Sequence, residues 1–122
     1  MTLQDEHAKM VNKLVKPGKV IRQQMTDEKV NLWHMATGVV GEAGELIDAV
    51  KKVVAYNKTL DMENIIEELG DLEFYMEGVR QACGISRADT LAHNMTKLGA
   101  RYEGHNYSDE QAHQRKDKLN IS

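Results

Sequence analysis

Two short segments of this 122-residue sequence, EAGEL and ELGDL, each carry two carboxylates three residues apart. These are Glu42 and Glu45 in the first segment and Glu68 and Asp71 in the second. Residues three apart are neighbours on a helix surface, and four carboxylates that converge without a cation force at least one of them to protonate. A hard divalent ion such as Mg²⁺ removes this conflict, because it prefers oxygen ligands and is commonly completed by water and substrate phosphates. The spacing therefore predicts a metal site that handles phosphates.

A second interpretation needs no metal. A single E-x-x-E pair is more often a solvated helix face, and only the repetition of the pair in matched register favours a metal. The segments also contain Gly41, Gly44 and Gly70, and each glycine within a helix costs about 1 kcal/mol relative to alanine. We expect these glycines to let the two helices approach closely or to leave room beside the ion.

Two long helices must position the carboxylates. Thr26 followed by two acidic residues is typical of a helix N-terminus. Apolar residues then recur at alternating steps of four and three, at Leu32, Ala36, Val39, Ala43, Leu46, Val50 and Val53. A second helix is predicted over residues 61–82, with the stripe Ile65, Leu69, Leu72, Met76 and Val79. A short loop around Asn57 permits antiparallel packing through the stripes, which places both carboxylate pairs on the same edge.

The remaining segments also favour helices. A first helix is expected over residues 5–15, stopped by Pro17 and Gly18. Ser86 begins a third helix that reaches about residue 102, and Ser108 with Gln111 fits a capping box that opens a polar segment. No strand alternation occurs in the sequence, so we predict an all-α antiparallel bundle. It forms one domain, with an N-terminal helical segment at 1–25, a catalytic helical core at 26–104 and a polar C-terminal helix or tail at 105–122.

Composition narrows the possible partners. The net charge is −3 at pH 7 and there is no lysine or arginine run, which argues against a nucleic-acid polymer held by phosphate contacts. No apolar run approaches the roughly 18 residues of a membrane span, and the N-terminus lacks the pattern of a signal peptide. The single cysteine, Cys83, excludes an internal disulfide. We expect a cytoplasmic protein.

A candidate phosphate site lies downstream. Asn94, Lys97 and Arg101 follow one another at steps of three and four, on one face of the third predicted helix. Lysine and arginine four residues apart are suited to holding phosphate oxygens, arginine in a bidentate manner. Such a pair is often a solvated face, and the predicted metal site favours the phosphate interpretation.

Three longer segments resemble a known family. LWHMATGVVGEAGELIDAVKK, EELGDLEFY and NMTKLGARY are similar to the all-α NTP pyrophosphohydrolases of the MazG type. The family's hallmark, E-x-x-E followed by E-x-x-D, maps onto Glu42, Glu45, Glu68 and Asp71. The similarity extends over residues 17–117, and the tail resembles single-domain, often phage-encoded, members.

The resemblance implies Mg²⁺-dependent hydrolysis, sometimes with Mn²⁺, of nucleoside triphosphates to monophosphate and pyrophosphate. The four motif carboxylates are then metal ligands, and one of the glutamates, for example Glu45, is alternatively the residue that orients the attacking water. Lys97 and Arg101 hold phosphates, and Asn94 holds the sugar or a phosphate. The family forms dimers or tetramers, so we expect a homodimer or homotetramer.

Other residues near these motifs are candidates for contacts with the substrate. Lys52 lies on the same face as Glu45, and the aromatic residues near the motifs are candidates for stacking on a base: Trp33, His34, Phe74 and Tyr75. Two alternatives to a general pyrophosphohydrolase stay open. One is a dUTPase- or dCTPase-like enzyme specific for pyrimidines, and the other is a non-catalytic bundle that binds a nucleotide or a partner protein.

Overall fold

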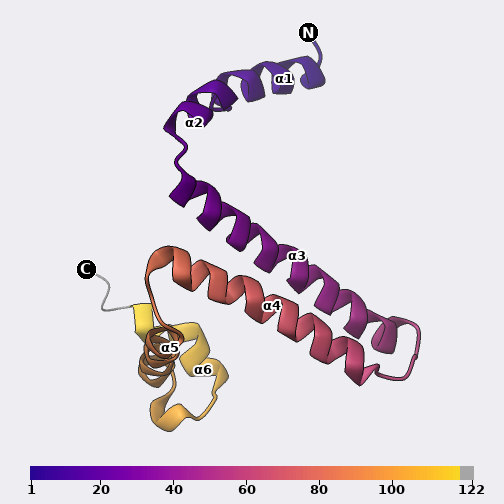
Figure 1. The fold of residues 1–122 in the computed structure, drawn as a ribbon, viewed down its shortest axis with the longest axis vertical. Helices are drawn as coiled ribbons and strands as arrows, with labels where there is room; N and C mark the ends of the chain where they lie inside the picture. The colour runs from indigo at the N-terminus through magenta and orange to yellow at the C-terminus, as the bar shows by residue number, and fades with distance from the viewer. Residues whose placement is uncertain (119–122) are drawn as a thin grey trace.

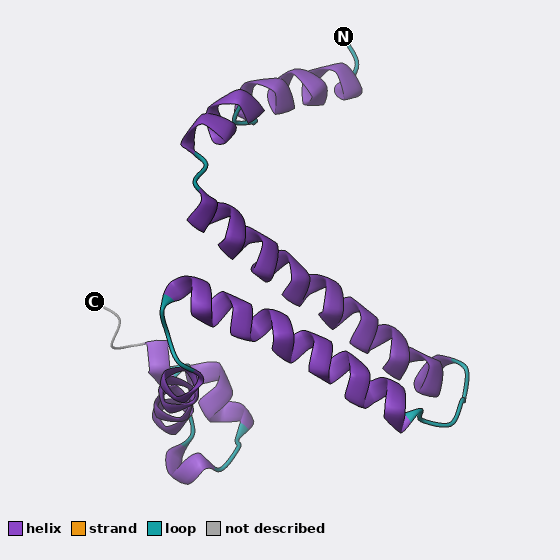
Figure 2. Ribbon diagram, in the orientation of Figure 1, coloured by secondary structure: helices purple, strands orange, loops and turns teal. Residues whose placement is uncertain are grey.

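All regular structure in the described part of the chain is helical. The computed structural model describes residues 1–118. Its helices, in chain order, are α1 (Leu3–Leu14), α2 (Gly18–Gln24), α3 (Asp27–Ala55), α4 (Met62–Cys83), α5 (Arg87–Arg101), η1 (Glu103–His105), α6 (Asp109–Gln114) and η2 (Lys116–Lys118) (Figures 1 and 2). The prediction of an all-α protein is confirmed. The C-terminal segment at 105–122 is described as far as residue 118, and its last four residues lie outside the described part.

The helices α3 and α4 form an antiparallel hairpin, which is the most extensive packing contact in the described chain (Figure 1). The Thr26 side chain caps α3 by accepting a hydrogen bond from the Lys29 amide at 3.2 Å. The Asp61 side chain caps α4 in the same way, accepting from the Asn64 amide at 3.1 Å. These caps satisfy amide groups that have no partner within the helix. Both long helices therefore begin within one residue of the predicted positions.

The face of α3 that meets α4 is rotated from the predicted stripe. Val39, Leu46 and Val53 of the stripe are half-buried, and Ala49, which the stripe did not include, is buried. The other stripe residues of α3 remain exposed, namely Leu32, Ala36, Ala43 and Val50. The prediction that the whole stripe faces α4 was wrong, because the apolar arc of α3 is wider than one neighbouring helix covers.

Close approach of the two helices depends on different glycines from those expected. A Cβ atom at Gly38 would overlap the ring of Tyr75, and one at Gly78 would overlap the side chain of Met35. At Gly41, Gly44 and Gly70 a Cβ atom would meet nothing within 4 Å. These three glycines therefore do not bring the helices together, and the alternative expectation, that they leave room beside the ion, stays a prediction.

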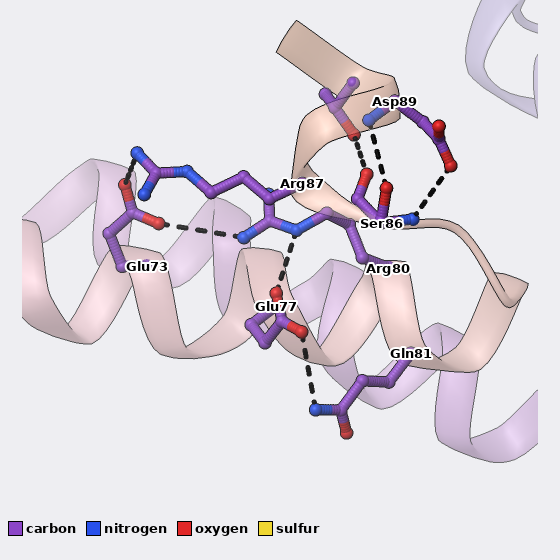
Figure 3. Close-up of polar contacts among 8 residues, drawn as sticks. Glu73, Glu77, Arg80, Gln81, Ser86, Arg87 and Asp89 are labelled. Atoms are coloured by element: carbon purple, nitrogen blue, oxygen red, sulfur yellow. Dashed lines mark hydrogen bonds and ion pairs between the residues drawn. The ribbon is translucent and has the colours of Figure 1, made fainter.

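The turn between α4 and α5 is held by local polar contacts. Gly84 ends α4 with a φ of 68°, a left-handed conformation that glycine adopts without strain. Ser86 and Asp89 form a reciprocal capping box at the start of α5 (Figure 3). Arg80, which is buried, donates to Glu77 at 2.9 Å, and Glu73 lies within 4 Å of both Arg80 and Arg87. The ion pair with Glu73 thereby links Arg87, the first residue of α5, to α4.

The C-terminal segment folds back onto α5. The Ser108 side chain caps α6 by accepting from the Gln111 amide. The Gln111 side chain does not complete the predicted capping box. It accepts instead from the Glu103 amide at 3.1 Å. A ring nitrogen of His105 lies 3.2 Å from the Met95 carbonyl oxygen. The turn after α5 is therefore fixed by hydrogen bonds to side chains.

The N-terminal helices form an arm. Pro17 stops α1, as predicted, and it also stands at the N-cap of α2, a helix that we did not predict. Neither α1 nor α2 packs extensively against another described element, and Figure 1 shows both projecting away from the hairpin. No helix in the described residues is long and apolar enough to span a membrane.

Candidate metal centre

Three of the four predicted carboxylates converge between α3 and α4. One ligand oxygen from each of Glu42, Glu68 and Asp71 can be chosen so that all lie within 4.8 Å of one another. Glu42 comes from α3, and the other two come from successive turns of α4. The antiparallel pairing of the two motifs therefore brings carboxylates from both helices to one point, as the matched register predicts.

Glu68 has the least favourable surroundings of the three. Its Oε2 atom is buried and has no hydrogen-bond partner among residues 1–118. Burial raises the pKa of this carboxyl group, and the negative charges of Glu42, Glu45, Asp71 and Glu67 raise it further. A buried acceptor without a partner is costly. A bound cation would satisfy the orphaned oxygen and neutralise the surrounding charge, so the residues present fit a divalent metal ion.

Glu45 lies outside this group and lines a hollow beside it. The hollow has a volume of about 290 Å³ and shares Glu68 with the cluster. Its lining comprises Glu45, Asp48, Ala49, Lys51, Lys52, Tyr56, Asn64 and Glu68. Lys52 had been singled out from the sequence, whereas Lys51, Tyr56 and Asn64 had not. Asn64 precedes Glu68 by four residues, and that spacing was the available signal that the two share a face.

A second hollow flanks the other side of the cluster. It has a volume of about 320 Å³ and is lined by Glu42, Asp71, Phe74 and Tyr75. The two aromatic rings meet edge to face, with centroids 5.1 Å apart. His34 contacts Tyr75 with ring centroids 6.3 Å apart. Trp33 does not line this hollow, and its side chain is 67% exposed. Two of the four aromatic candidates therefore border the carboxylates directly.

The predicted phosphate ligands lie in a different environment. Nε and Nη2 of Arg101 donate to the two carboxylate oxygens of Asp117 at 2.8 and 3.1 Å. Lys97 lines a separate hollow, of about 270 Å³, that also includes Asp117. Asn94 is exposed on α5. The structure thus brings neither Lys97 nor Arg101 to the hollows that flank the carboxylates.

We compared the sequence with models of known protein families, with curated proteins and with solved structures. A family model described as the MazG nucleotide pyrophosphohydrolase domain matches residues 32–105, which is more than half of the chain. The chain belongs to the MazG family. Searches of curated proteins and of solved structures found no match. The MazG region includes all seven residues predicted to form the site, and the arm and Asp117 lie outside it.

The ion pair between Arg101, which lies in the MazG region, and Asp117 leads to a prediction about the stability of the fold. The Asp117 side chain is 1% exposed, and its hydrogen bonds from Arg101 hold the pKa of the Asp117 carboxyl below its usual range. The stabilisation is therefore complete above the unfolded pKa of about 3.9. It is lost as the pH falls through the lower folded pKa. We expect Asp117→Asn to lower the urea midpoint at pH 7, and the difference from wild type to shrink below about pH 4. Urea titrations followed by circular dichroism would measure this, and a difference independent of pH would contradict it.

Proposed function

We propose that this chain hydrolyses nucleoside triphosphates to a monophosphate and pyrophosphate, using Mg²⁺ held by Glu42, Glu68 and Asp71. The observation that carries this proposal is the buried Oε2 of Glu68, which has no hydrogen-bond partner in the described part of the chain and lies among other carboxylates. Membership of the MazG family supports the class of reaction. Mn²⁺ has the same preference for oxygen ligands and is expected to substitute.

The metal, when bound, polarises phosphoryl oxygens and makes a bound water more acidic. Glu45 is the carboxylate available to accept a proton from the attacking water, because it lines the hollow beside Glu68 and lies outside the group that fits the ion. We assign it the role of orienting the attacking water and accepting its proton as the oxygen bonds to phosphorus. The pyrophosphate leaves as the phosphoanhydride bond breaks.

The two hollows suggest how the substrate lies. Lys51 and Lys52 provide positive charge beside Glu68, which suits the phosphates. Phe74 and Tyr75 provide aromatic surface beside Asp71, which suits a base. The nucleotide would therefore cross the carboxylate cluster with its base toward Phe74 and its phosphates toward Lys52.

Lys97, Arg101 and Asn94 remain predicted phosphate and sugar ligands. In that role they would have to approach the carboxylates from α5 of a second copy, or after α5 has moved relative to the hairpin. The expectation of a homodimer or homotetramer is compatible with the first route. Lys51 and Lys52 need no such rearrangement.

Product analysis tests this function. The chain is incubated with Mg²⁺ and each of the common ribo- and deoxyribonucleoside triphosphates, and the products are identified by phosphorus NMR. We expect a monophosphate and pyrophosphate. Diphosphate with orthophosphate would mean that a different bond is cleaved. Absence of turnover with every nucleotide, with Mn²⁺ as well, would favour the non-catalytic bundle.

A further inference from the structure

The arm carries a charge of opposite sign to the rest of the chain. Residues 1–25 contain five lysines and arginines and two carboxylates, whereas residues 26–122 contain eleven lysines and arginines and seventeen carboxylates. The formal charge is therefore +3 on the arm and −6 on the remainder. Both carboxylates of the arm, Asp5 and Glu6, lie in the first turn of α1, and residues 7–26 contain none. Positive charge is thus concentrated between the first turn of α1 and the start of α3.

The cations of the arm have no carboxylate partner in the described part of the chain. They are Lys9, Lys13, Lys16, Lys19 and Arg22. None of them takes part in an ion pair within residues 1–118. Lys16 donates a hydrogen bond to the neutral side chain of Gln24 at 2.7 Å, which leaves its charge uncompensated. Cations that follow one another without intervening carboxylates raise the local potential together, so the arm attracts anions.

Helix α1 also has an apolar side. Four of its apolar residues are between 43% and 82% exposed: Leu3, Met10, Val11 and Leu14. At about 100° per residue, Leu3, Met10 and Leu14 fall within an arc of about 40°, and Val11 lies about 60° beyond Leu14. We call these four residues the arm face. The arm face is uncovered, because neither α1 nor α2 packs extensively against another described element.

The lysines of α1 lie along one edge of the arm face. Lys13 is about 60° and Lys9 about 100° from Met10 around the helix axis, toward the polar side. Glu6 shares this edge closer to the N-terminus, and Asn12 lies on the opposite side of the helix. Long lysine side chains can cover apolar surface while their ammonium groups reach a polar layer. An apolar side bordered by cations is typical of a helix that lies in the interface of a membrane.

The arm can meet a surface without covering the candidate metal centre. It projects away from the hairpin at the start of α3 (Figure 1). Asp27 begins α3, and Glu42 of the centre follows fifteen residues later, which is about 22 Å along the helix axis. The acidic part of the chain is therefore held away from an anionic surface that the arm contacts.

The two kinds of side chain on the arm together select the partner. A nucleic-acid backbone would pair with the cations and leave the arm face exposed to water. An uncharged apolar surface would cover the arm face and leave the five cations without anions. A bilayer that contains anionic lipids supplies both headgroup charge and acyl chains. We propose that the arm binds the surface of anionic lipid membranes, with α1 lying among the headgroups and its arm face toward the acyl chains.

The test is the partition of the full-length chain onto sedimented vesicles, measured in the presence of a chelator and without nucleotide. Vesicles of phosphatidylcholine alone are compared with vesicles of phosphatidylcholine and phosphatidylglycerol in equal parts. We expect the partition coefficient to be at least about tenfold higher on the anionic vesicles. It should fall as added salt screens the charges. A chain that binds neither kind of vesicle, or both equally, would overturn the proposal.

Two variants of α1 separate insertion of the arm face from attraction of charge. Leu14→Asp and Asn12→Asp add the same negative charge two residues apart, but only the first places it on the arm face. On anionic vesicles we expect Leu14→Asp to lower the partition coefficient by on the order of fiftyfold and Asn12→Asp by about fivefold. Equal losses would mean that the arm recognises charge alone, as a nucleic-acid ligand would, and would overturn the proposal.

Light scattering on the same variants tests the other possible cover for the arm face. Both variants are expected to keep the mass of the wild type in solution. A lower mass for Leu14→Asp alone would mean that a second copy of the chain covers the arm face, and would overturn the proposal. These measurements need no nucleotide and no metal, so their outcome is independent of the proposed hydrolysis.

Discussion

Glu68→Gln is expected to lower kcat/KM for nucleoside triphosphate hydrolysis by on the order of 100- to 1,000-fold. The substitution removes one of the three carboxylates that fit the ion. Electrostatic stabilisation by a bound metal is worth several kcal/mol, and each 1.36 kcal/mol is a factor of ten in rate. Steady-state kinetics with Mg²⁺ would measure the loss. The matched control is Glu63→Gln on the same helix, which changes an exposed carboxylate outside the cluster and should leave kcat/KM unchanged.

The same variant should change stability in the opposite direction when no divalent ion is present. Glutamine removes a charge that burial and four neighbouring carboxylates disfavour, so the metal-free variant should melt at a higher temperature than the metal-free wild type. Added Mg²⁺ should raise the melting temperature of the wild type only. A metal present at one hundred times its Kd would contribute about 2.7 kcal/mol. A variant that melts lower than wild type without metal, and still responds to Mg²⁺, would contradict the assigned role of Glu68.

Gly38→Ala is expected to lower the free energy of unfolding, although alanine is the better helix former. Alanine within a helix gains about 1 kcal/mol over glycine. At this position its Cβ would overlap the Tyr75 ring at the contact between α3 and α4. Overpacking of this kind typically costs about 1–3 kcal/mol. Urea denaturation followed by circular dichroism would measure the net loss.

The control for this prediction lies one turn further along α3. A Cβ at Gly41 meets nothing within 4 Å, so Gly41→Ala should raise the free energy of unfolding by up to about 1 kcal/mol. The two substitutions are chemically identical and differ only in what faces the new methyl group. Equal effects of the two would show that helix propensity alone determines the outcome and that the packing against Tyr75 is unimportant.

Features set by neighbouring residues could be predicted from the sequence. The caps predicted at Thr26 and Ser86 depend on a side chain and an amide three residues away, and both are present. The rotation of α3 about its axis could not be predicted, because its apolar residues span a broad arc. For the same reason the glycines at the helix contact, Gly38 and Gly78, were not distinguished from Gly41 and Gly44.

The candidate site likewise has parts that could be predicted from the sequence and parts that could not. The convergence of Glu42, Glu68 and Asp71 follows from the matched register of two motifs on paired helices. The position of Arg101 depends on the direction in which α5 leaves the turn at Gly84, and on Asp117, which is sixteen residues away. A contact between residues so far apart in the sequence leaves no periodic pattern from which it could be predicted. The lysines beside Glu68 depend on how α3 ends near the loop, and only Lys52 was suggested by its spacing from Glu45.

The central claim is that the carboxylates of α3 and α4 form a divalent metal centre. The most direct measurement is a titration with Mn²⁺, in which electron paramagnetic resonance counts the ions bound per chain without nucleotide. We expect the wild type to bind at least one Mn²⁺ per chain, Mg²⁺ to displace it, and Glu42→Gln to weaken the binding by at least tenfold. A wild type that binds no Mn²⁺, or a Glu42→Gln variant that binds it equally well, would contradict the metal centre.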